Sequence, residues 1–437
     1  MQHSTPARNW VGDNGKIIEP LFADYFLSLH PMRCFQGRLF TVDGMVEDEA
    51  PLKKEIYEQI RYYATTSVAR RIEHIMQAIK LACASEPPKI QTDRIYVRNG
   101  TYFVDGHFSA EKEYCMNRLP IAYVSDAPAP TRWLQFLIEL LYEEDIPALQ
   151  EYIGYCLLPV TKAQKMLLMV GKGGEGKSRI GLILRELFGS SMYTGSLQKV
   201  ETNRFARADL EYKLLLVDDD MKTEALPQTN NIKTLVTLED KIDIERKGQQ
   251  SVQGTLYVRF ACFGNGSLHA LYDKSNGFYR RQLLLTTKEK PVGRVDDPFL
   301  IDKMRNEKEG ILLWALEGLH RLIRNNYRFT ISERTAANLK EAMEQGNNIL
   351  GFLKSEGYFE IRQGAKCKST DFYKVYERWC LDNLEKPLAA STFIHHLKDN
   401  QKSLGIVYDD KCIGTNRGFH NVDVDLFLPV DVPSPWD

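Results

Sequence analysis

The sequence lacks three features that would assign it to a broad class at once: a long apolar run, a strong excess of one charge, and closely spaced cysteines. Because no apolar run approaches the ~20 residues of a membrane-spanning helix, we expect no membrane partner. The N-terminal residues also lack the apolar core of a signal peptide, which predicts a cytoplasmic protein. With 57 Lys and Arg against 58 Asp and Glu, the overall charge neither indicates nor excludes a nucleic-acid partner.

The eight cysteines are scattered along the chain, and no two are spaced as the CxxC pair of a zinc knuckle or ribbon. Their even number is a weak hint of disulfides, but the preferred interpretation is a reduced cytosolic protein whose thiols are structural. The cysteines therefore indicate no metal site.

A chain of 437 residues is too long for one ordinary core and predicts about two to four domains. We expect an accessory domain with helices and short strands over 1–125, a helical segment over 126–164, an α/β domain over 165–330, and a linker helix with a small domain over 331–437. The last part is predicted to contain two helices followed by a hairpin. This pattern fits a winged-helix module, and a small α+β cap is the alternative.

Strands and helices alternate in the third part of the chain. The strands are predicted at 166–170, 213–217, 256–264 and 281–287. This alternation predicts an α/β domain with a mainly parallel sheet.

The sequence GKGGEGKS follows the first of these strands directly and precedes an amphipathic helix. Strand, glycine-rich loop and helix are the setting of a P-loop, whose glycines let backbone N–H groups point at phosphate oxygens. The helix N-terminus adds the positive end of its dipole. The alternative is a glycine turn with an exposed lysine. The predicted nucleotide-binding residues are Gly171, Lys172, Gly173, Gly174, Glu175, Gly176, Lys177 and Ser178.

This loop predicts an enzyme that hydrolyses ATP or GTP with Mg²⁺ as the cofactor. Lys177 is expected to reach the β- and γ-phosphates, and Ser178 to offer its hydroxyl to Mg²⁺. The acidic run Asp218, Asp219 and Asp220 ends the second strand, where carboxylates can meet the metal side of the site. We assign Asp218 to Mg²⁺ and Asp219 to water activation, with Asp220 as its rival. A solvated acidic turn is the alternative.

Two later strands bring further candidates. Asn265 follows the third strand, where its amide can hold the attacking water, although Asn-Gly is also a common turn pair. Arg280 and Arg281 precede or begin the fourth strand, and one of them could stabilise transition-state charge, in cis or across a subunit boundary. Surface arginines that form salt bridges are the alternative.

The ordered set GKGGEGKS, LLLVDDD, FACFGNG and GFYRRQLLL resembles superfamily 3 helicases, and more closely the phage and plasmid primase–helicase family related to poxvirus-type primase-helicases. The resemblance covers about residues 90–435. The stretches WLQFLIELL and LQEYIGYCLLP look like the family's helical collar, and DIERKGQQS looks like its DNA-contacting hairpin. YERWCLDNLEKPLAASTFIHHL resembles its C-terminal winged-helix region.

The resemblance implies an AAA+ type P-loop ATPase of the additional-strand, catalytic-glutamate class, in which the triple Asp replaces a frequent Asp-Glu pair. It implies that Lys247 tracks single-stranded DNA and that Arg280 or Arg281 acts on the neighbour's ATP, so that a homohexamer forms. About 90 residues precede the matching region, which is too short for a primase core. A separate primase or initiator is therefore a possible partner, and a bacterial cell is the expected location.

The function that this implies is an ATP-dependent hexameric helicase on single-stranded or forked DNA, for replication of a phage, prophage or mobile element. A ring ATPase that remodels a protein or replication-initiation complex without unwinding is the second hypothesis. A monomeric P-loop kinase fits less well, because no lid signature is present.

Overall fold

The computed structural model describes residues 9–13, 15–64, 66–221, 229–238, 241–248, 250–265, 276–291, 293–346, 348–385 and 387–424. The chain separates into two compact units, Met1–Asn338 and Leu339–Asp437. The finer division into four parts stays a prediction. Among the described residues, no helix combines the length and the apolar character needed to cross a membrane.

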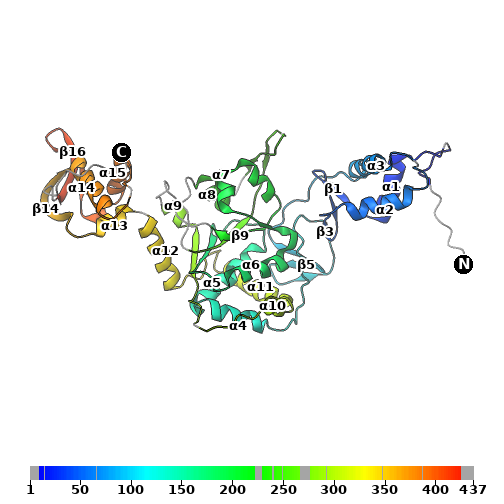
Figure 1. Ribbon diagram of the computed structural model, residues 1–437, viewed down its shortest axis with the longest axis horizontal. Helices are drawn as coiled ribbons and strands as arrows, with labels where there is room; N and C mark the ends of the chain where they lie inside the picture. The colour runs from blue at the N-terminus through cyan, green and yellow to red at the C-terminus, as the bar shows by residue number, and fades with distance from the viewer. Residues whose placement is uncertain are drawn as a thin grey trace. The chain divides into compact units, whose positions relative to one another are not determined.

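The first unit begins with an N-terminal lobe, residues 9–85, in which three helices pack around a small core (Figure 1). Trp10, Phe22 and Phe26 are almost fully buried there. An antiparallel sheet of order β1-β2-β3 accompanies the helices. The elements of the lobe are α1 (Glu19–Leu29), β1 (Arg33–Phe35), β2 (Arg38–Thr41), β3 (Gly44–Met45), α2 (Ala50–Ile60) and α3 (Val68–Ala82).

A second small antiparallel sheet follows the lobe, and helices then lead to the main sheet. These elements are β4 (Arg94–Val97), β5 (Gly100–Phe103), β6 (Phe108–Ser109), α4 (Thr131–Leu140), the 3₁₀ turn η1 (Glu143–Asp145) and α5 (Ile146–Cys156). The segment before the main sheet is thus helical, as its apolar spacing predicts.

The centre of the first unit is a five-stranded sheet in which every neighbouring pair is parallel. Its order is β13-β7-β12-β9-β8, so β12 lies between β7 and β9. The predicted α/β architecture with a parallel sheet is confirmed, and the short edge strand β8 is an addition to the four predicted strands. The strands are β7 (Met166–Val170), β8 (Met192–Thr194), β9 (Leu215–Met221), β12 (Arg259–Gly264) and β13 (Gln282–Thr286).

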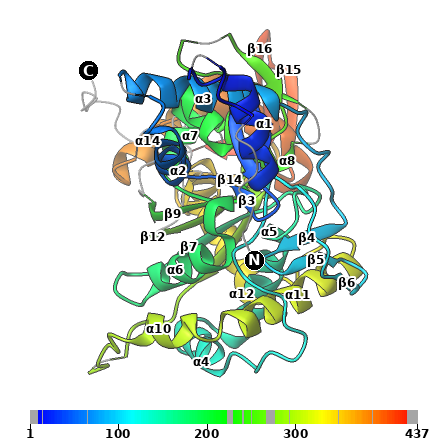
Figure 2. The ribbon, with the colours of Figure 1, turned by 90° about the vertical axis from the view of Figure 1, so that its right-hand side faces the viewer.

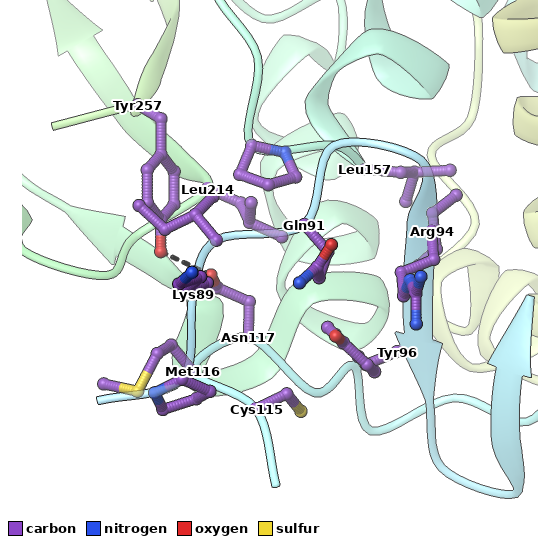
Figure 3. Close-up of a pocket in the computed structure, with 14 residues that line it drawn as sticks. Lys89, Gln91, Arg94, Tyr96, Cys115, Met116, Asn117, Leu157, Leu214 and Tyr257 are labelled. Atoms are coloured by element: carbon purple, nitrogen blue, oxygen red, sulfur yellow. Dashed lines mark hydrogen bonds between the residues drawn. The ribbon is translucent and has the colours of Figure 1, made fainter. Parts of the chain in front are cut away.

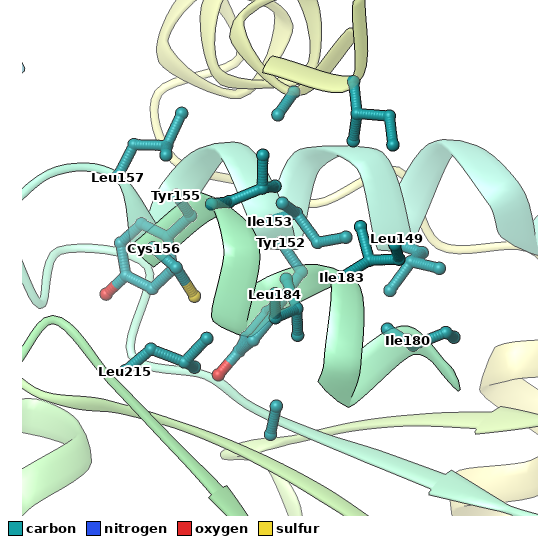
Figure 4. Close-up of a cluster of buried hydrophobic side chains, with 14 of the residues drawn as sticks. Leu149, Tyr152, Ile153, Tyr155, Cys156, Leu157, Ile180, Ile183, Leu184 and Leu215 are labelled. Atoms are coloured by element: carbon teal, nitrogen blue, oxygen red, sulfur yellow. The ribbon is translucent and has the colours of Figure 1, made fainter. Parts of the chain in front are cut away.

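Strand residues on both faces of the sheet are buried, as is typical of a parallel sheet. Alternate strand residues such as Leu167, Val217 and Phe263 join one core cluster with α4, α5, α6 and α11. Figure 4 shows α5 and α6 contributing side chains to this cluster, and Figure 2 shows α6 beside the sheet. The remaining elements of the unit are α6 (Lys177–Phe188), η2 (Gly189–Ser191), α7 (Leu197–Thr202), η3 (Arg204–Leu210), α8 (Asn230–Thr237), β10 (Ile242–Ile244), β11 (Val252–Gly254), α9 (Asn276–Tyr279), α10 (Leu300–Arg305), α11 (Lys308–Arg324) and α12 (Glu333–Gly346), which crosses the boundary between the units.

Two features hold α5 in place. A Cβ on Gly154 would lie 2.3 Å from the Ala315 carbonyl oxygen, so only glycine lets α5 and α11 approach this closely. At the end of α5, the buried Arg259 guanidinium donates to the carbonyls of Cys156 at 2.9 Å and Val160 at 3.0 Å. It also donates to the carbonyls of Leu158 and Tyr257. Arg259 therefore links β12 to the carbonyl end of α5.

The second unit has its own core and an antiparallel sheet of order β14-β16-β15. Its two main helices and its hairpin lie where the sequence predicts them, and β14 adds a third strand; residues 425–428, the predicted end of the hairpin, lie outside the described residues. The winged-helix interpretation of the unit remains a proposal. The elements are α13 (Asn348–Lys354), β14 (Phe359–Lys368), α14 (Ser369–Asp382), α15 (Ala390–Asp399), α16 (Gln401–Leu404), β15 (Val407–Ile413) and β16 (Asn416–Val424).

Candidate nucleotide-binding site

The glycine-rich loop connects the carboxyl end of β7 to the first residue of α6. Gly173, Gly174 and Gly176 have φ angles of 112°, 80° and 117°, which L-residues with a side chain rarely adopt. The N-cap residue of α6 is Gly176, which has no side chain, so it leaves the N–H groups of the first turn to other acceptors. The loop therefore has the backbone of an anion-binding site.

The loop holds an anion of its own. The Lys177 ammonium lies 2.8 Å from Oε2 of Glu175, and the Gly173 N–H donates to Oε1 of the same carboxylate at 2.7 Å. Glu175 is 3% exposed and Lys177 is 8% exposed. Burial works to raise the pKa of Glu175, but the hydrogen bonds from Lys177 and the loop backbone, together with the Lys177 charge, outweigh it and the pKa is lowered. A lysine and a backbone N–H thus already converge on a buried carboxylate.

The acidic run on β9 divides between the two faces of the sheet. Asp219 lies on the α6 side and accepts a hydrogen bond from the Ser178 hydroxyl. Asp218 lies on the other side, where its Oδ2 accepts from the Leu197 N–H at 2.7 Å at the start of α7. Asp220 is exposed. The structure therefore brings Asp219, and not Asp218, to the loop.

Loss of hydration raises the pKa values of both carboxyls. For Asp218 the cause is burial, which the N–H donors only partly offset. For Asp219 the desolvation outweighs the Ser178 hydrogen bond, which acts to lower the pKa. The predicted roles of Asp218 and Asp219 stay predictions, but Asp218 in this position acts as a cap for α7.

Asn265 directly follows β12 and meets the loop. Its Oδ1 lies 3.5 Å from the Lys177 ammonium, and its side chain would contact a Cβ placed on Gly173. The parallel pairing of β12 with β7 explains this, because both strands end at the same edge of the sheet. Gly266, the second residue of the predicted turn, lies outside the described residues.

Arg280 and Arg281 lie at the amino ends of the strands, opposite the carboxyl ends where the loop begins. The Arg281 carbonyl accepts from the Met166 N–H at 2.8 Å, at the beginning of β7, and the Arg281 guanidinium donates to the Gly277 carbonyl. The loop follows the other end of β7, roughly 16 Å away for a five-residue strand. The structure thus brings neither arginine to the loop of its own chain.

One arginine that the sequence does not single out does reach the loop. Nη2 of Arg294 donates to the Glu175 carbonyl at 3.1 Å and pairs with Asp296 at the same distance. Close by, Arg179 donates to the Asp297 carbonyl at 3.2 Å. Arg294 follows the fourth predicted strand in an irregular segment, so neither a sequence motif nor a hydrophobic periodicity indicates that it lies at the loop.

Lys247 lies in the connection of an antiparallel hairpin formed by β10 and β11. Its side chain is exposed, and it lines a groove with Lys199 and Asn203 rather than the nucleotide-binding loop. A hairpin is therefore present where the resemblance implies one, and its role in DNA binding stays a prediction.

A small pocket elsewhere in the first unit has a different character (Figure 3). Its lining includes Tyr96 and Cys115, and the Tyr257 hydroxyl donates to Oδ1 of Asn117 at 2.6 Å. Leu214 and Tyr257 precede β9 and β12, which places the pocket at the amino ends of the strands. None of the loop residues lines it.

Comparisons with known proteins find a family model that matches part of the first unit and solved structures whose fold is similar over nearly the whole chain. A family model described as "Family of unknown function (DUF5906)" matches residues 169–281, which contain the loop, the acidic run and the hairpin. No curated protein matches the sequence. The apo structure of the NrS-1 C terminal region is similar over 93% of this chain and 99% of that chain, with 14% identity and a TM-score of 0.52. Its A form apo structure matches over 92% and 100% of the two chains, with 12% identity and a TM-score of 0.50. At this identity the similarity concerns the fold: the chain resembles the NrS-1 C terminal region over nearly its whole length.

Proposed function

We propose that this chain is an ATP-dependent DNA helicase that serves the replication of a phage, prophage or mobile element and works as a ring. The observation that carries the proposal is the convergence of Lys177 and the Gly173 N–H on one buried carboxylate. A site that stabilises a buried anion with a lysine and a backbone N–H, beside an uncapped helix N-terminus, has the donors that nucleotide phosphates need.

In this proposal the nucleotide's phosphates displace the Glu175 carboxylate and take over its contacts. Ser178 and Asp219 are the oxygen ligands that fit Mg²⁺, because they are adjacent at the edge of the sheet and Asp218 faces the other way. Bound Mg²⁺ would neutralise phosphate charge.

Asn265 and Arg294 complete the site within one chain. Asn265 is already within reach of Lys177, so its amide can contact the phosphate end of a nucleotide or the attacking water. Arg294 contacts the backbone of the loop, and we propose that it adds positive charge beside the phosphates.

The position of the two arginines, at the amino ends of the strands, supports the proposal of a ring. Arg280 and Arg281 lie too far along β13 to reach their own loop, so a role in charge stabilisation requires a neighbouring subunit. The β12 strand between β7 and β9 also fits the additional-strand class of ATPases, to which the resemblance points.

The direct test of this function measures ATP turnover and fork unwinding by the full-length protein. We expect single-stranded DNA to stimulate ATP turnover and a forked duplex to be unwound only with hydrolysable ATP. Turnover that DNA leaves unchanged, with no unwinding, would favour a ring ATPase that remodels a protein complex.

Subunit mixing tests the arginines. We expect Arg280→Ala or Arg281→Ala to remove turnover, because the neighbour's phosphates lose a positive charge. Mixing the inactive arginine variant with Lys177→Ala protein should restore part of the activity, since some interfaces then combine an intact loop with an intact arginine. Arg328→Ala, an exposed arginine of the same unit, is the control. If neither arginine variant loses turnover in assembled protein, the assignment fails.

A further inference from the structure

A groove runs beside the β10–β11 hairpin and draws its walls from three parts of the first unit. Arg38 comes from β2 of the N-terminal lobe, Lys199 and Phe205 come from α7 and η3, and Arg246 and Lys247 come from the hairpin connection. A second groove shares Arg38 and Arg246 with it. The two grooves therefore form one continuous surface, which we call the hairpin groove.

Positive charge gathers in the hairpin groove although the whole chain has a net charge of −1. Its carboxylates are Asp209 and Glu211, and Glu211 pairs with Arg246. Within the described part of the chain, Arg38, Lys199 and Lys247 form no ion pair. The cationic residues that line the groove are Arg38, Lys89, Lys199, Lys241, Arg246 and Lys247.

An aromatic ring stands among these cations. Phe205 is 36% exposed, and the Arg204 guanidinium lies over its ring at 4.9 Å. Tyr212 lines the continuation of the groove. Arg204 itself pairs with Glu245 at 3.2 Å. An exposed ring in a groove lined by cations is nevertheless an arrangement that binds a nucleic-acid strand, with bases stacked on rings and phosphates on cations.

We infer that the hairpin groove binds single-stranded nucleic acid, and that the N-terminal lobe is part of this binding surface through Arg38. Phosphates contact Arg38, Lys199 and Lys247, and a base stacks on Phe205. The inference rests on the proposed function for its choice of partner. It adds a task for the lobe and a contact surface beyond the hairpin lysine.

The test uses full-length protein without nucleotide and a fluorescent oligothymidylate, with anisotropy as the readout. We expect Arg38→Glu and Lys199→Glu each to weaken binding about tenfold or more at ~0.1 M salt, because each reverses a phosphate contact. Arg38→Ala should lower the slope of log K against log salt by about 0.7. Phe205→Ala should weaken binding about tenfold and leave that slope unchanged.

Lys54→Glu is the matched control, because Lys54 is an exposed lysine on α2 of the same lobe and does not line the groove. ATP turnover without DNA should be the same in all these variants, which shows that they fold and separates this inference from the nucleotide site. Wild-type affinity of both Arg38→Glu and Lys199→Glu would overturn the inference. Equal weakening by Lys54→Glu, or binding of an acidic peptide in preference to the oligonucleotide, would do the same.

If the wild-type protein binds the oligonucleotide but hydrolyses no ATP, the proposed enzymatic function is wrong and the inference that the groove binds nucleic acid is kept. If it hydrolyses ATP and binds no single strand, the groove inference fails and the nucleotide site stands. A duplex oligonucleotide of equal length distinguishes a single-strand site from a general attraction to phosphate.

Discussion

Lys177→Ala is expected to lower ATP turnover by at least about a hundredfold, the scale seen when a preorganised charge at a reacting centre is removed. The ammonium is held in place before any nucleotide arrives, by Glu175 at 2.8 Å and Asn265 at 3.5 Å. Alanine removes the only buried lysine among the residues of the loop. Turnover is measured with saturating ATP and Mg²⁺, so that weaker binding alone does not explain the loss.

Lys172→Ala is the comparison within the same loop. The Lys172 ammonium is exposed and pairs with Glu289 at 2.5 Å, away from the buried carboxylate, so its loss should cost a few-fold at most. Equal losses for Lys172→Ala and Lys177→Ala would contradict the assignment, and so would a Lys177→Ala protein that still turns ATP over.

Glu175→Gln is expected to act in the opposite direction on binding. Glutamine keeps the size of the side chain and removes the charge that competes with phosphate for Lys177. A charge-assisted hydrogen bond contributes about 1.5–3 kcal/mol, so the Kd for a fluorescent ATP analogue should fall roughly tenfold or more. Glu186→Gln, on the outer part of α6 and paired with Arg305, is the matched control. A Kd that rises would mean that Glu175 helps to hold the nucleotide.

The second large effect concerns stability. Arg259→Met should destabilise the first unit by about 3 kcal/mol or more, because it leaves several buried carbonyls without a donor, at about 1–3 kcal/mol for each. The affected carbonyls are those of Cys156, Leu158, Val160 and Tyr257. The guanidinium also lies over the Tyr155 ring at 5.3 Å, and this contact is lost as well.

Hydrogen exchange locates this effect. The amides of α5 should lose protection by about a hundredfold in Arg259→Met, while those of the second unit should not change. Arg328→Met, an exposed arginine in the same unit, should stay within about 0.5 kcal/mol of the wild type. If α5 keeps its protection in Arg259→Met, the guanidinium is not what holds the end of this helix.

The sequence predicts best the features whose cause is local. The buried run 166–170, the glycine-rich loop and the helix after it are adjacent in the chain, so their pattern indicates their structure directly. The parallel sheet follows from the alternation of strands and helices, and it carries Asn265 to the loop because parallel strands end at one edge. The three-residue strand β8 has too short a pattern to be recognised.

Side-chain positions depend on contacts that the sequence does not state. Strand alternation separates Asp218 from Asp219, but only the packing of α6 shows that Asp219 is the one beside Ser178. The motif places Glu175 among the nucleotide-binding residues, but nothing in the sequence shows that its carboxylate turns into the loop. Arg294 lies in an irregular segment, and Arg38 belongs to a lobe distant in sequence from the hairpin, so neither has a periodic signal.

The distance between the two edges of the sheet limits how copies of the chain can complete the proposed site. Each copy has its loop at the carboxyl edge of the strands and Arg280 and Arg281 at the amino edge. A two-fold dimer can complete the site only if the loop and the arginines lie in one self-complementary patch, and it then forms two sites. A head-to-tail contact joins unlike edges at every interface, and such contacts close into a ring or continue as a filament. Turnover per chain should therefore fall steeply on dilution, and an isolated copy should bind nucleotide without cleaving it.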